Sequence, residues 1–274
     1  MPELPEVQTI VRQLRPKAVG KKIGQVKVLD SKAINLRPGD FVNKVEGKSI
    51  KNIKRRAKII IWELSAGHYL IFHLKLNGRI LLVDNSEKPH KETRVVFNFP
   101  NKKKVFFDDS RRFAWVHFYD ERGFENFLKK QNFGPEPLEK SFTLKVFKER
   151  LARRPNSKIK PLLMDQKFIA GVGNIYAQEA CFHAGIMPTR TVKSLKDKEI
   201  KKLYSSLIKI LKEAVRQQGT SSDVYVDLYG RQGDYIEELK VYGREGESCD
   251  QCGAKIKVMK LSGRGTRYCP RCQA

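Results

Sequence analysis

The sequence predicts a multidomain α+β protein: an N-terminal antiparallel β-sandwich with an N-terminal helix, then a helical domain, then a C-terminal zinc finger. Three observations support this fold class. Short segments with the two-residue period of strands fill residues 23–119, helical periodicity follows a break near residue 134, and four cysteines lie in the last 26 residues. A chain of 274 residues is long enough for more than one core.

The first 20 residues predict a helix. Val7, Ile10, Val11 and Leu14 recur at the spacing that places apolar side chains on one helical face. Pro5 is compatible with this prediction because proline is tolerated in the first turn of a helix.

Strand patterns follow this helix. Residues 25–29, 58–62 and 95–99 are short runs rich in β-branched or aromatic residues, with Gly, Asn, Asp and Pro between such runs. Many short strands at this spacing are typical of an antiparallel sandwich. The Gly-Pro-Glu-Pro run at residues 134–137 interrupts the pattern, so the first domain is expected at residues 1–133.

The rest of the chain is predominantly helical. Residues 200–215 have the pattern of a long amphipathic helix, and a shorter helix is expected at residues 175–184. Residues 219–243 show no clear period and predict a loop. The helical domain is therefore expected at residues 134–243 and the zinc finger at residues 244–274.

The net charge limits the class of partner. Lys plus Arg number 55 and Asp plus Glu number 30, which gives +25. This excess attracts polyanions, so the candidate partners are nucleic acid, an anionic membrane surface or an acidic protein. No apolar run approaches the ~18 residues of a membrane span, and Glu3 and Glu6 stand where an export leader is basic or apolar. We expect a cytoplasmic protein.

The four C-terminal cysteines have the spacing of a zinc site. The pairs Cys249-x2-Cys252 and Cys269-x2-Cys272 are separated by 16 residues. Four thiolates complete a tetrahedron and leave no position for a substrate, so the zinc is expected to be structural. Two disulfides are the alternative, which a reducing compartment disfavours. Cys181 stands alone in an apolar stretch and is expected to be buried.

The N-terminus has the chemistry of a nucleophile. Removal of Met1 leaves Pro2 with a secondary α-amine, and α-amino groups have pKa values of about 7.7–8.0. The neutral fraction of such an amine attacks an aldehyde-like carbon and forms an iminium ion. Glu3 and Glu6 are candidates for the general acid and for electrostatic support. The same residues also fit an ordinary helix start.

Further segments each have two interpretations. Lys58 ends a basic run that either contacts phosphates or forms a solvated strand edge. The loop Arg111–Phe113 either wedges between bases or is a hairpin turn. Residues 171–174 either present N–H groups to a phosphate or form a tight turn with an Asn cap. His73, taken alone, is more typical of a structural residue.

These motifs follow one another in a fixed order along residues 2–273. They are Pro2-Glu3-Leu4-Pro5-Glu6, Arg55-Arg56-Ala57-Lys58, His73-Leu74, Arg111-Arg112-Phe113, Gly134-Pro135-Glu136-Pro137-Leu138, Lys160-Pro161-Leu162-Leu163, Gly171-Val172-Gly173-Asn174-Ile175-Tyr176, Val241-Tyr242-Gly243-Arg244, Gly263-Arg264-Gly265-Thr266 and Cys269-Pro270-Arg271-Cys272-Gln273. In this order they resemble the bacterial formamidopyrimidine-DNA glycosylase family, the 8-oxoguanine DNA glycosylase/AP lyases.

The resemblance implies a helix-two-turn-helix element in the helical domain and a lesion-recognition loop near residues 219–243. It implies that Pro2 is the nucleophile and that Glu3 is the acid/base at the sugar ring. It also implies that Glu6 is a second catalytic carboxylate and that Lys58 contacts phosphate and assists strand cleavage.

DNA contacts are implied as well. Asn174 and Arg264 resemble the residues that grip the phosphates flanking a flipped nucleotide. His73 and Tyr242 are similar in position to other backbone contacts. The residues implied to enter or probe the base stack are Leu76, Arg111, Arg112 and Phe113.

Three positions depart from the family pattern. Leu76 replaces the usual intercalating Met, which keeps an apolar wedge with less reach. Ser110 replaces a common Pro, which is expected to loosen the loop before Arg111. Gln8 replaces a common Glu, and little effect is expected.

The resemblance implies a bifunctional DNA glycosylase/AP lyase of base excision repair. Its substrate is damaged double-stranded DNA, from which it excises the oxidised purines 8-oxoguanine and formamidopyrimidines through a Pro2 Schiff base and β,δ-elimination. One structural Zn2+, a monomer and a nucleoid-associated location are expected. Two alternatives remain open: an endonuclease VIII-like enzyme for oxidised pyrimidines, and a catalytically silent zinc-ribbon DNA-binding protein.

Overall fold

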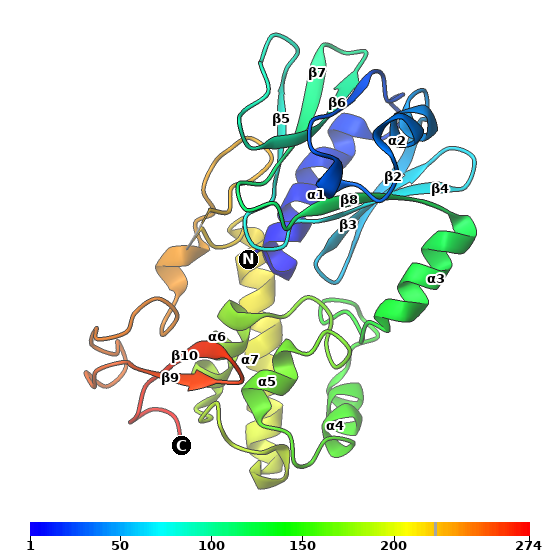
Figure 1. Cartoon of the computed structure of the whole chain (residues 1–274). Coiled ribbons are helices and arrows are strands. Elements are labelled where there is room, and N and C mark those ends of the chain that lie inside the picture. Colours follow the sequence, from blue (N-terminus) through cyan, green and yellow to red (C-terminus); the bar gives the residue numbers. More distant parts are fainter. Residues whose placement is uncertain (222–223) are drawn as a thin grey trace. The chain divides into compact units, whose positions relative to one another are not determined.

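The chain forms two compact units (Figure 1). The computed structural model describes residues 1–221 and 224–274. The first unit contains Met1–Asn132 and Gln218–Asp234, and the second contains Phe133–Gln217 and Tyr235–Ala274.

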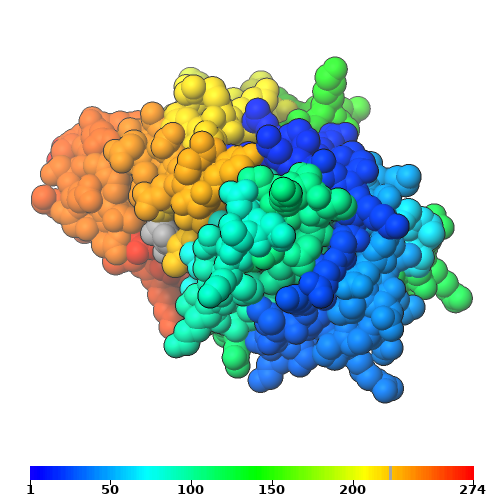
Figure 2. Space-filling model, turned by 90° about the horizontal axis from the view of Figure 1, so that it is seen from above, coloured from blue at the N-terminus to red at the C-terminus, as the bar shows by residue number. Residues whose placement is uncertain are grey.

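The sequence-based division places residues 219–243 in the helical domain, whereas the segment 218–234 clusters with the first unit. It packs with the first unit, because the buried side chains of Tyr225 and Leu228 join that unit's core. The main-chain N–H of Leu82 also donates to the carbonyl of Leu228 at 2.9 Å. Figure 2 shows the gold surface of this segment beside the teal surface of the sandwich.

The predicted antiparallel sandwich lies in the first unit. Its two four-stranded sheets have the strand orders β1-β6-β7-β5 and β2-β3-β4-β8, and the paired strands are antiparallel. The strands are β1 (Val26–Val28), β2 (Ile50–Arg56), β3 (Ile59–Leu64), β4 (His68–His73), β5 (Arg79–Asp84), β6 (Thr93–Phe99), β7 (Lys103–Asp108) and β8 (Trp115–Asp120).

Aromatic residues join the two sheets. The ring of Trp62 lies 4.7 Å from Phe72 in its own sheet and 5.4 Å from Phe97 in the other, measured between centroids. All three are fully buried. This contact fixes the sheets face to face, so the loops at the ends of the strands start from a rigid support.

The helices of the first unit confirm one prediction and correct another. The predicted N-terminal helix is α1 (Leu4–Ala18), which packs against β2 and β3. A second helix, α2 (Pro38–Val45), lies where only strands were expected, because Pro38 begins a turn that buries Phe41 and Val45 one turn apart. The other helices of this unit are η1 (Ser31–Ala33) and α3 (Glu121–Gln131).

The second unit is helical, as predicted. The helices expected at residues 175–184 and 200–215 are α6 and α7, and they pack against each other. Cys181 is fully buried on α6, which confirms its predicted burial. The helices are α4 (Leu144–Ala152), α5 (Ile159–Met164), α6 (Asn174–Ala184), η2 (Val192–Ser194), α7 (Asp197–Arg216) and η3 (Tyr235–Glu238).

The predicted loop at residues 219–243 contains, in its described part, only the short helix η3. Residues 222–223 of that prediction lie outside the described residues. The chain ends in a hairpin of β9 (Lys257–Leu261) and β10 (Arg264–Tyr268). Among the described residues, no helix has the length and apolar character needed to cross a bilayer.

Candidate active site and nucleic-acid interface

The N-terminal end of α1 is a buried cluster of the predicted catalytic residues. Glu3 is the N-cap of α1, and its main-chain N–H donates to Glu6 Oε2 at 2.7 Å. The Glu3 side chain accepts from the main chain of Glu6 in return, which completes a capping box. Pro2 is buried, and Glu3 and Glu6 are each 1% exposed. The capping box therefore fixes the backbone that follows the candidate nucleophile.

The second oxygen of Glu6 holds the 218–234 segment. Glu6 Oε1 accepts from the main-chain N–H of Thr220 at 2.8 Å. Gly219 must be glycine at this contact, because its φ is +87° and a Cβ there would lie 2.9 Å from Glu6 Cγ and Oε1. Both Glu6 oxygens therefore accept main-chain N–H groups, one from each segment.

Lys58 lies in the turn between β2 and β3. It is only 6% exposed, and Ala57 before it has a left-handed φ of +50°. Arg55 stabilises this turn, since its Nη1 donates to the Ala57 carbonyl and its Nε to Gln8 Oε1, both at 2.9 Å. Gln8 therefore joins α1 to the turn that carries Lys58.

His73 is a neutral hydrogen-bond donor. Its Nδ1 accepts from the main-chain N–H of Lys75 at 3.0 Å, so its proton resides on Nε2. Burial, together with the positive charges of Lys75 and Lys58, lowers the pKa of His73 to about 3. A phosphate contact by His73 is then a hydrogen bond without ion pairing.

The loop after β4 presents Leu76, which is partly buried. The main-chain N–H of Gly78 closes this loop on the Leu74 carbonyl at 2.8 Å, and a Cβ at Gly78 would lie 2.5 Å from that oxygen. Asn77 donates to the Ser110 hydroxyl at 3.1 Å, so the Leu76 loop is joined to the loop 109–114.

A buried carboxylate shapes the loop that carries Arg111 and Phe113. Asp109 is 0% exposed, and its Oδ1 accepts from the N–H of Arg111 at 3.0 Å. Its Oδ2 accepts from the N–H groups of Phe113 at 2.6 Å and Ala114 at 2.7 Å. Asp109 thus holds the backbone that follows Ser110 through three N–H groups.

This loop exposes the predicted probe residues. Phe113 is 54% exposed, and the Arg111 guanidinium lies 5.3 Å from its ring centroid. Arg112 has a left-handed φ of +57°, and its Nε lies 3.2 Å from Asp30 Oδ2. Arg112 is thus held by a carboxylate of its own unit, whereas Phe113 extends into solvent.

In the second unit, Asn174 begins α6. Its Oδ1 accepts from Lys160 Nζ at 2.6 Å, and Lys160 is 0% exposed. The preceding loop is held by Gln166, whose Oε1 accepts from the N–H of Gly171 at 2.8 Å and whose Nε2 donates to the Val172 carbonyl at 2.7 Å. An amide and a buried cation therefore meet at a helix N-terminus, an arrangement suited to an anion.

Gln178 connects α6 to the terminal hairpin that carries the exposed Arg264. Its Nε2 donates to the Asn174 carbonyl, and its Oε1 accepts from the N–H of Arg267, both at 2.6 Å. Gln178 is 0% exposed, and its Nε2 also lies 3.4 Å from the Gly265 carbonyl, so its side chain serves main-chain groups and not solvent. Asn174 and Arg264 are thereby placed on one rigid support although they are 90 positions apart.

Tyr242 is positioned by a buried carboxylate. Glu179 is 1% exposed, and its two oxygens accept from the N–H groups of Lys240, Val241 and Tyr242 at 2.9–3.0 Å. Burial raises the pKa of Glu179, while these hydrogen bonds oppose the shift. The Arg267 guanidinium lies 5.3 Å from the Tyr242 ring centroid.

The four predicted zinc ligands come together. The sulfurs of Cys249, Cys252, Cys269 and Cys272 all lie within 4.8 Å of one another. The Sγ atoms of Cys249 and Cys272 are 3.8 Å apart, close to the ~3.8 Å edge of a tetrahedron with Zn–S bonds of about 2.3 Å. Disulfide bonding requires ~2.05 Å, so the arrangement fits one structural zinc ion and not two disulfides.

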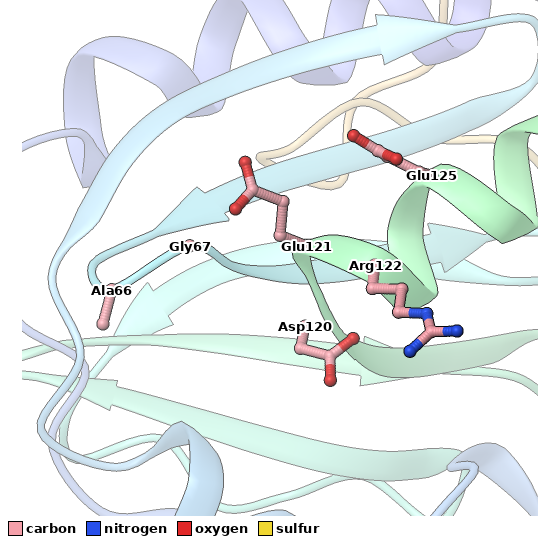
Figure 3. Close-up of a pocket in the computed structure, with 6 residues that line it drawn as sticks. All are labelled: Ala66, Gly67, Asp120, Glu121, Arg122 and Glu125. Carbon is pink, nitrogen blue, oxygen red and sulfur yellow. The ribbon is translucent and has the colours of Figure 1, made fainter.

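A surface hollow of about 460 Å³ lies elsewhere on the first unit (Figure 3). It is lined by Ala66, Gly67, Asp120, Glu121, Arg122 and Glu125. Three of these six side chains are carboxylates, which repel phosphate, and Asp120 is already engaged as the N-cap of α3. This hollow contains none of the predicted site residues.

The positioning residues that were not predicted from the sequence include Gln13, Asp109, Gln166, Gln178 and Glu179. Each acts through main-chain groups or through partners distant in the chain, so no local motif marks it. The signal for Asp109 was its place directly before the Arg111–Phe113 loop.

Family profiles match three parts of the chain. "Formamidopyrimidine-DNA glycosylase N-terminal domain" matches residues 1–116. "Formamidopyrimidine-DNA glycosylase H2TH domain" matches residues 133–226, and "Zinc finger found in FPG and IleRS" matches residues 246–274.

Relatives match over the full length. A formamidopyrimidine-DNA glycosylase of Listeria monocytogenes is 39% identical, with 100% of both chains covered. That of Pelotomaculum thermopropionicum is 40% identical and covers 100% of this chain and 99% of its own. Lactococcus lactis Fpg, solved in complex with abasic-site DNA, is 33% identical with a TM-score of 0.91 and 99% coverage of both chains.

The fold and site define a DNA-binding class with a β-sandwich, a helix-two-turn-helix domain and a four-cysteine zinc finger. The chain belongs to the formamidopyrimidine-DNA glycosylase family.

Proposed function

We propose that this chain excises oxidised purines from double-stranded DNA with the Pro2 amine as nucleophile. It is a DNA glycosylase/AP lyase of base excision repair. The observation that supports Pro2 most directly is the capping box at the start of α1, which places the buried Glu3 next to Pro2 and fixes the backbone between them. Removal of Met1 exposes the secondary amine.

The chemistry requires only this amine and carboxyl groups. The Pro2 nitrogen lone pair attacks C1′, and the C1′–N bond to the base breaks with its electron pair leaving on the base, which takes up the proton that the Pro2 nitrogen loses. Glu3 protonates the ring oxygen, which opens the sugar and gives an iminium ion. The iminium acidifies C2′–H, so loss of that proton expels the 3′ phosphate, and a second elimination expels the 5′ phosphate. Hydrolysis then regenerates Pro2.

Glu6 supports this step by position. Both of its oxygens accept main-chain N–H groups, from Glu3 and from Thr220. Glu6 therefore orients Glu3 and holds the segment 218–234, which we propose includes the lesion-recognition loop. Lys58 lies in a turn tied to α1 through Arg55 and Gln8, and we assign it a phosphate of the cleaved strand.

The remaining predicted residues are assigned to DNA. We propose that Asn174, Tyr242 and Arg264 grip the backbone, and that neutral His73 donates a hydrogen bond to it. Exposed Phe113 and partly buried Leu76 fill the stack vacated by the flipped nucleotide, at a cost of a few kcal/mol for unstacking. Arg111 pairs with the orphaned base, and Arg112 supports the loop from Asp30.

A second substrate class has a specific observation in its favour. Lactococcus lactis Fpg has been solved with oxidised-pyrimidine DNA, and it is 34% identical to this chain with a TM-score of 0.91. An endonuclease VIII-like scope is therefore tested alongside the purine scope by comparing both lesions in one duplex sequence.

We also propose that the protein acts as a monomer in the bacterial cytoplasm, associated with nucleoid DNA. The charge of +25 supports this location because it favours a polyanion. Light scattering of the purified protein, alone and with duplex, measures the stoichiometry.

The test uses a duplex with one 8-oxoguanine opposite cytosine. We expect strand cleavage, and borohydride is expected to trap a covalent complex. Pro2→Gly is expected to lower excision by about 10³-fold or more while duplex binding remains, because a flexible primary amine replaces the rigid secondary amine of proline. A protein that retains an N-terminal tag and still turns over normally contradicts the assignment.

A further inference from the structure

One side chain of α1 that belongs to no predicted motif makes three hydrogen bonds to the segment 218–234. Gln13 Nε2 donates to Asp227 Oδ2 at 2.9 Å and to Gln218 Oε1 at 3.1 Å. Gln13 Oε1 accepts from the main-chain N–H of Leu228 at 3.0 Å. Gln13 thus contacts the segment at Gln218, where it begins, and again at Asp227 and Leu228.

Gln13 lies seven positions after Glu6, so the two side chains fall on the same face of α1. Glu6 holds Thr220 and Gln13 holds Leu228. We call the described residues of this segment, 218–221 and 224–234, the arch; they are tied to α1 at Thr220 and at Leu228. Tyr225, within the arch, donates its hydroxyl to the Gln218 carbonyl at 3.1 Å.

Asp227 is buried, and it is the side chain that Gln13 binds next to Leu228. It is 0% exposed, and its Oδ1 accepts from the N–H groups of Tyr229 and Arg231 at 2.9 Å. Its Oδ2 accepts from Gln13 and from Arg231 Nε. The turn after Leu228 is therefore built around the carboxylate that Gln13 binds.

The arch lies next to the candidate nucleophile. Glu6 bonds through one oxygen to Thr220 and through the other to Glu3, which follows Pro2. A base whose C1′ comes within bonding distance of Pro2 must lie within a few ångströms of this shared carboxylate. The position of the arch thus bears on which base fits at the reacting sugar.

We propose that Gln13 is a positioning residue for base recognition: it fixes the 218–234 arch on the helix that carries Glu6 and thereby sets which base is accepted beside Pro2. This inference rests on the proposed function. Cleavage at a preformed abasic site needs Pro2 but no base, and it is therefore independent of the arch.

The decisive variant is Gln13→Glu. It places a carboxylate against Asp227 and removes both N–H donors, so repulsion between the two carboxylates is expected to weaken the neighbouring Leu228 contact as well. We expect excision of 8-oxoguanine to fall about tenfold or more and abasic-site cleavage to change less than about twofold. Gln13→Leu, which adds no charge, is expected to change the same ratio in the same direction.

A second substitution that restores the lost hydrogen bond distinguishes the contact between Gln13 and Asp227 from a general packing role of Gln13. In Gln13→Glu/Asp227→Asn the Asn amide can donate to the new carboxylate, so the excision ratio is expected to return to within about threefold of wild type. Hydrogen exchange of the Leu228 amide, followed in peptides spanning residues 224–235, is expected to quicken in the single variant and to slow again in the double variant. Gln25→Glu, the same change at an exposed site of the same unit, is the control.

Equal loss of base excision and abasic-site cleavage in Gln13→Glu, or no loss of either, overturns the inference. Absence of rescue with folded protein also overturns it. If wild type excises no damaged base although it cleaves abasic sites, the proposed function fails instead.

Discussion

The sandwich and the zinc module place their functional residues by different means. In the first unit, Trp62, Phe72 and Phe97 belong to a large apolar core, and buried carboxylates on that core shape the site. The core around the zinc module is small. Its buried residues are Phe182, Val241, Cys249, Ile256 and Cys269, and two of these, Cys249 and Cys269, are zinc ligands. The start of α1 is therefore placed by packing, whereas the hairpin that carries Arg264 is placed by the zinc ligands beside it.

Loss of zinc gives the largest expected effect. Cys252→Ala removes one of four ligands, and in zinc-finger peptides metal binding supplies about 10–16 kcal/mol of apparent folding free energy at pH 7. We expect loss of bound zinc and of DNA binding, with the sandwich still folded. Metal analysis, duplex titration and near-UV circular dichroism of the tryptophans measure the three outcomes. Active protein without zinc contradicts the comparison.

Asp109→Ala tests whether carboxylates shape the first unit's site. It leaves the buried N–H groups of Phe113 and Ala114 without their acceptor, at a cost of about 1–3 kcal/mol each before relaxation. We expect a lower melting temperature and weaker discrimination of the base opposite the lesion. Asp109→Asn keeps one acceptor oxygen and is expected to retain more of both. If the two variants have the same melting temperature and the same discrimination of the opposite base, Asp109 does not shape the loop through its acceptor oxygens.

Arg264→Ala tests the phosphate contact of the zinc hairpin. Each neutralised phosphate contributes about −0.9 to the slope of log K against log salt concentration, so about five contacts give a slope near −4 to −5. Arg264→Ala is expected to weaken damaged and undamaged duplexes alike and to flatten the slope by about 1. Titrations of both duplexes at four salt concentrations measure these changes. If Arg264→Ala weakens binding of the damaged duplex alone, the assignment of Arg264 as a general phosphate contact is wrong.

Phe113→Ala is the matched variant in the other unit. An apolar wedge fills the stack and displaces no counterion, so it should lower the preference for the lesion and leave the salt slope unchanged. The same titrations measure both quantities. A changed slope shows that the division between wedge and phosphate contacts is wrong.

The smallest expected effect concerns His73 and pH. Its pKa is lowered to about 3 in the folded chain, against the ordinary 6.5. Below pH 6.5 the unfolded chain therefore binds a proton on His73 that the folded chain does not. The free energy of unfolding consequently decreases as the pH is lowered. We expect wild type to lose about 1–2 kcal/mol relative to His73→Gln between pH 6.5 and 5, and nothing above pH 7. Urea unfolding at these pH values measures the difference.

Local patterns predicted much of this molecule. The cysteine spacing located the zinc site, and apolar periodicity located α1, α6 and α7. The helix α2 was missed because its apolar residues Phe41 and Val45 lie within a stretch too short to distinguish from a strand.

Contacts between distant segments could not be predicted from the sequence. Gln13 and Asp227 are 214 positions apart, and Gln178 and Arg267 are 89 apart. Nothing near Gln13 in the chain indicates that a loop returns to it, since its partners are more than 200 positions away. The packing of residues 218–234 with the first unit was missed for the same reason.

We propose that Pro2 attacks the damaged nucleoside from the capped start of α1. Borohydride reduction during turnover, followed by proteolysis and mass spectrometry, locates the attached sugar directly. The account predicts an adduct on the N-terminal peptide that begins at Pro2, with Met1 absent. An adduct on Lys58, or on a peptide that retains Met1, contradicts it.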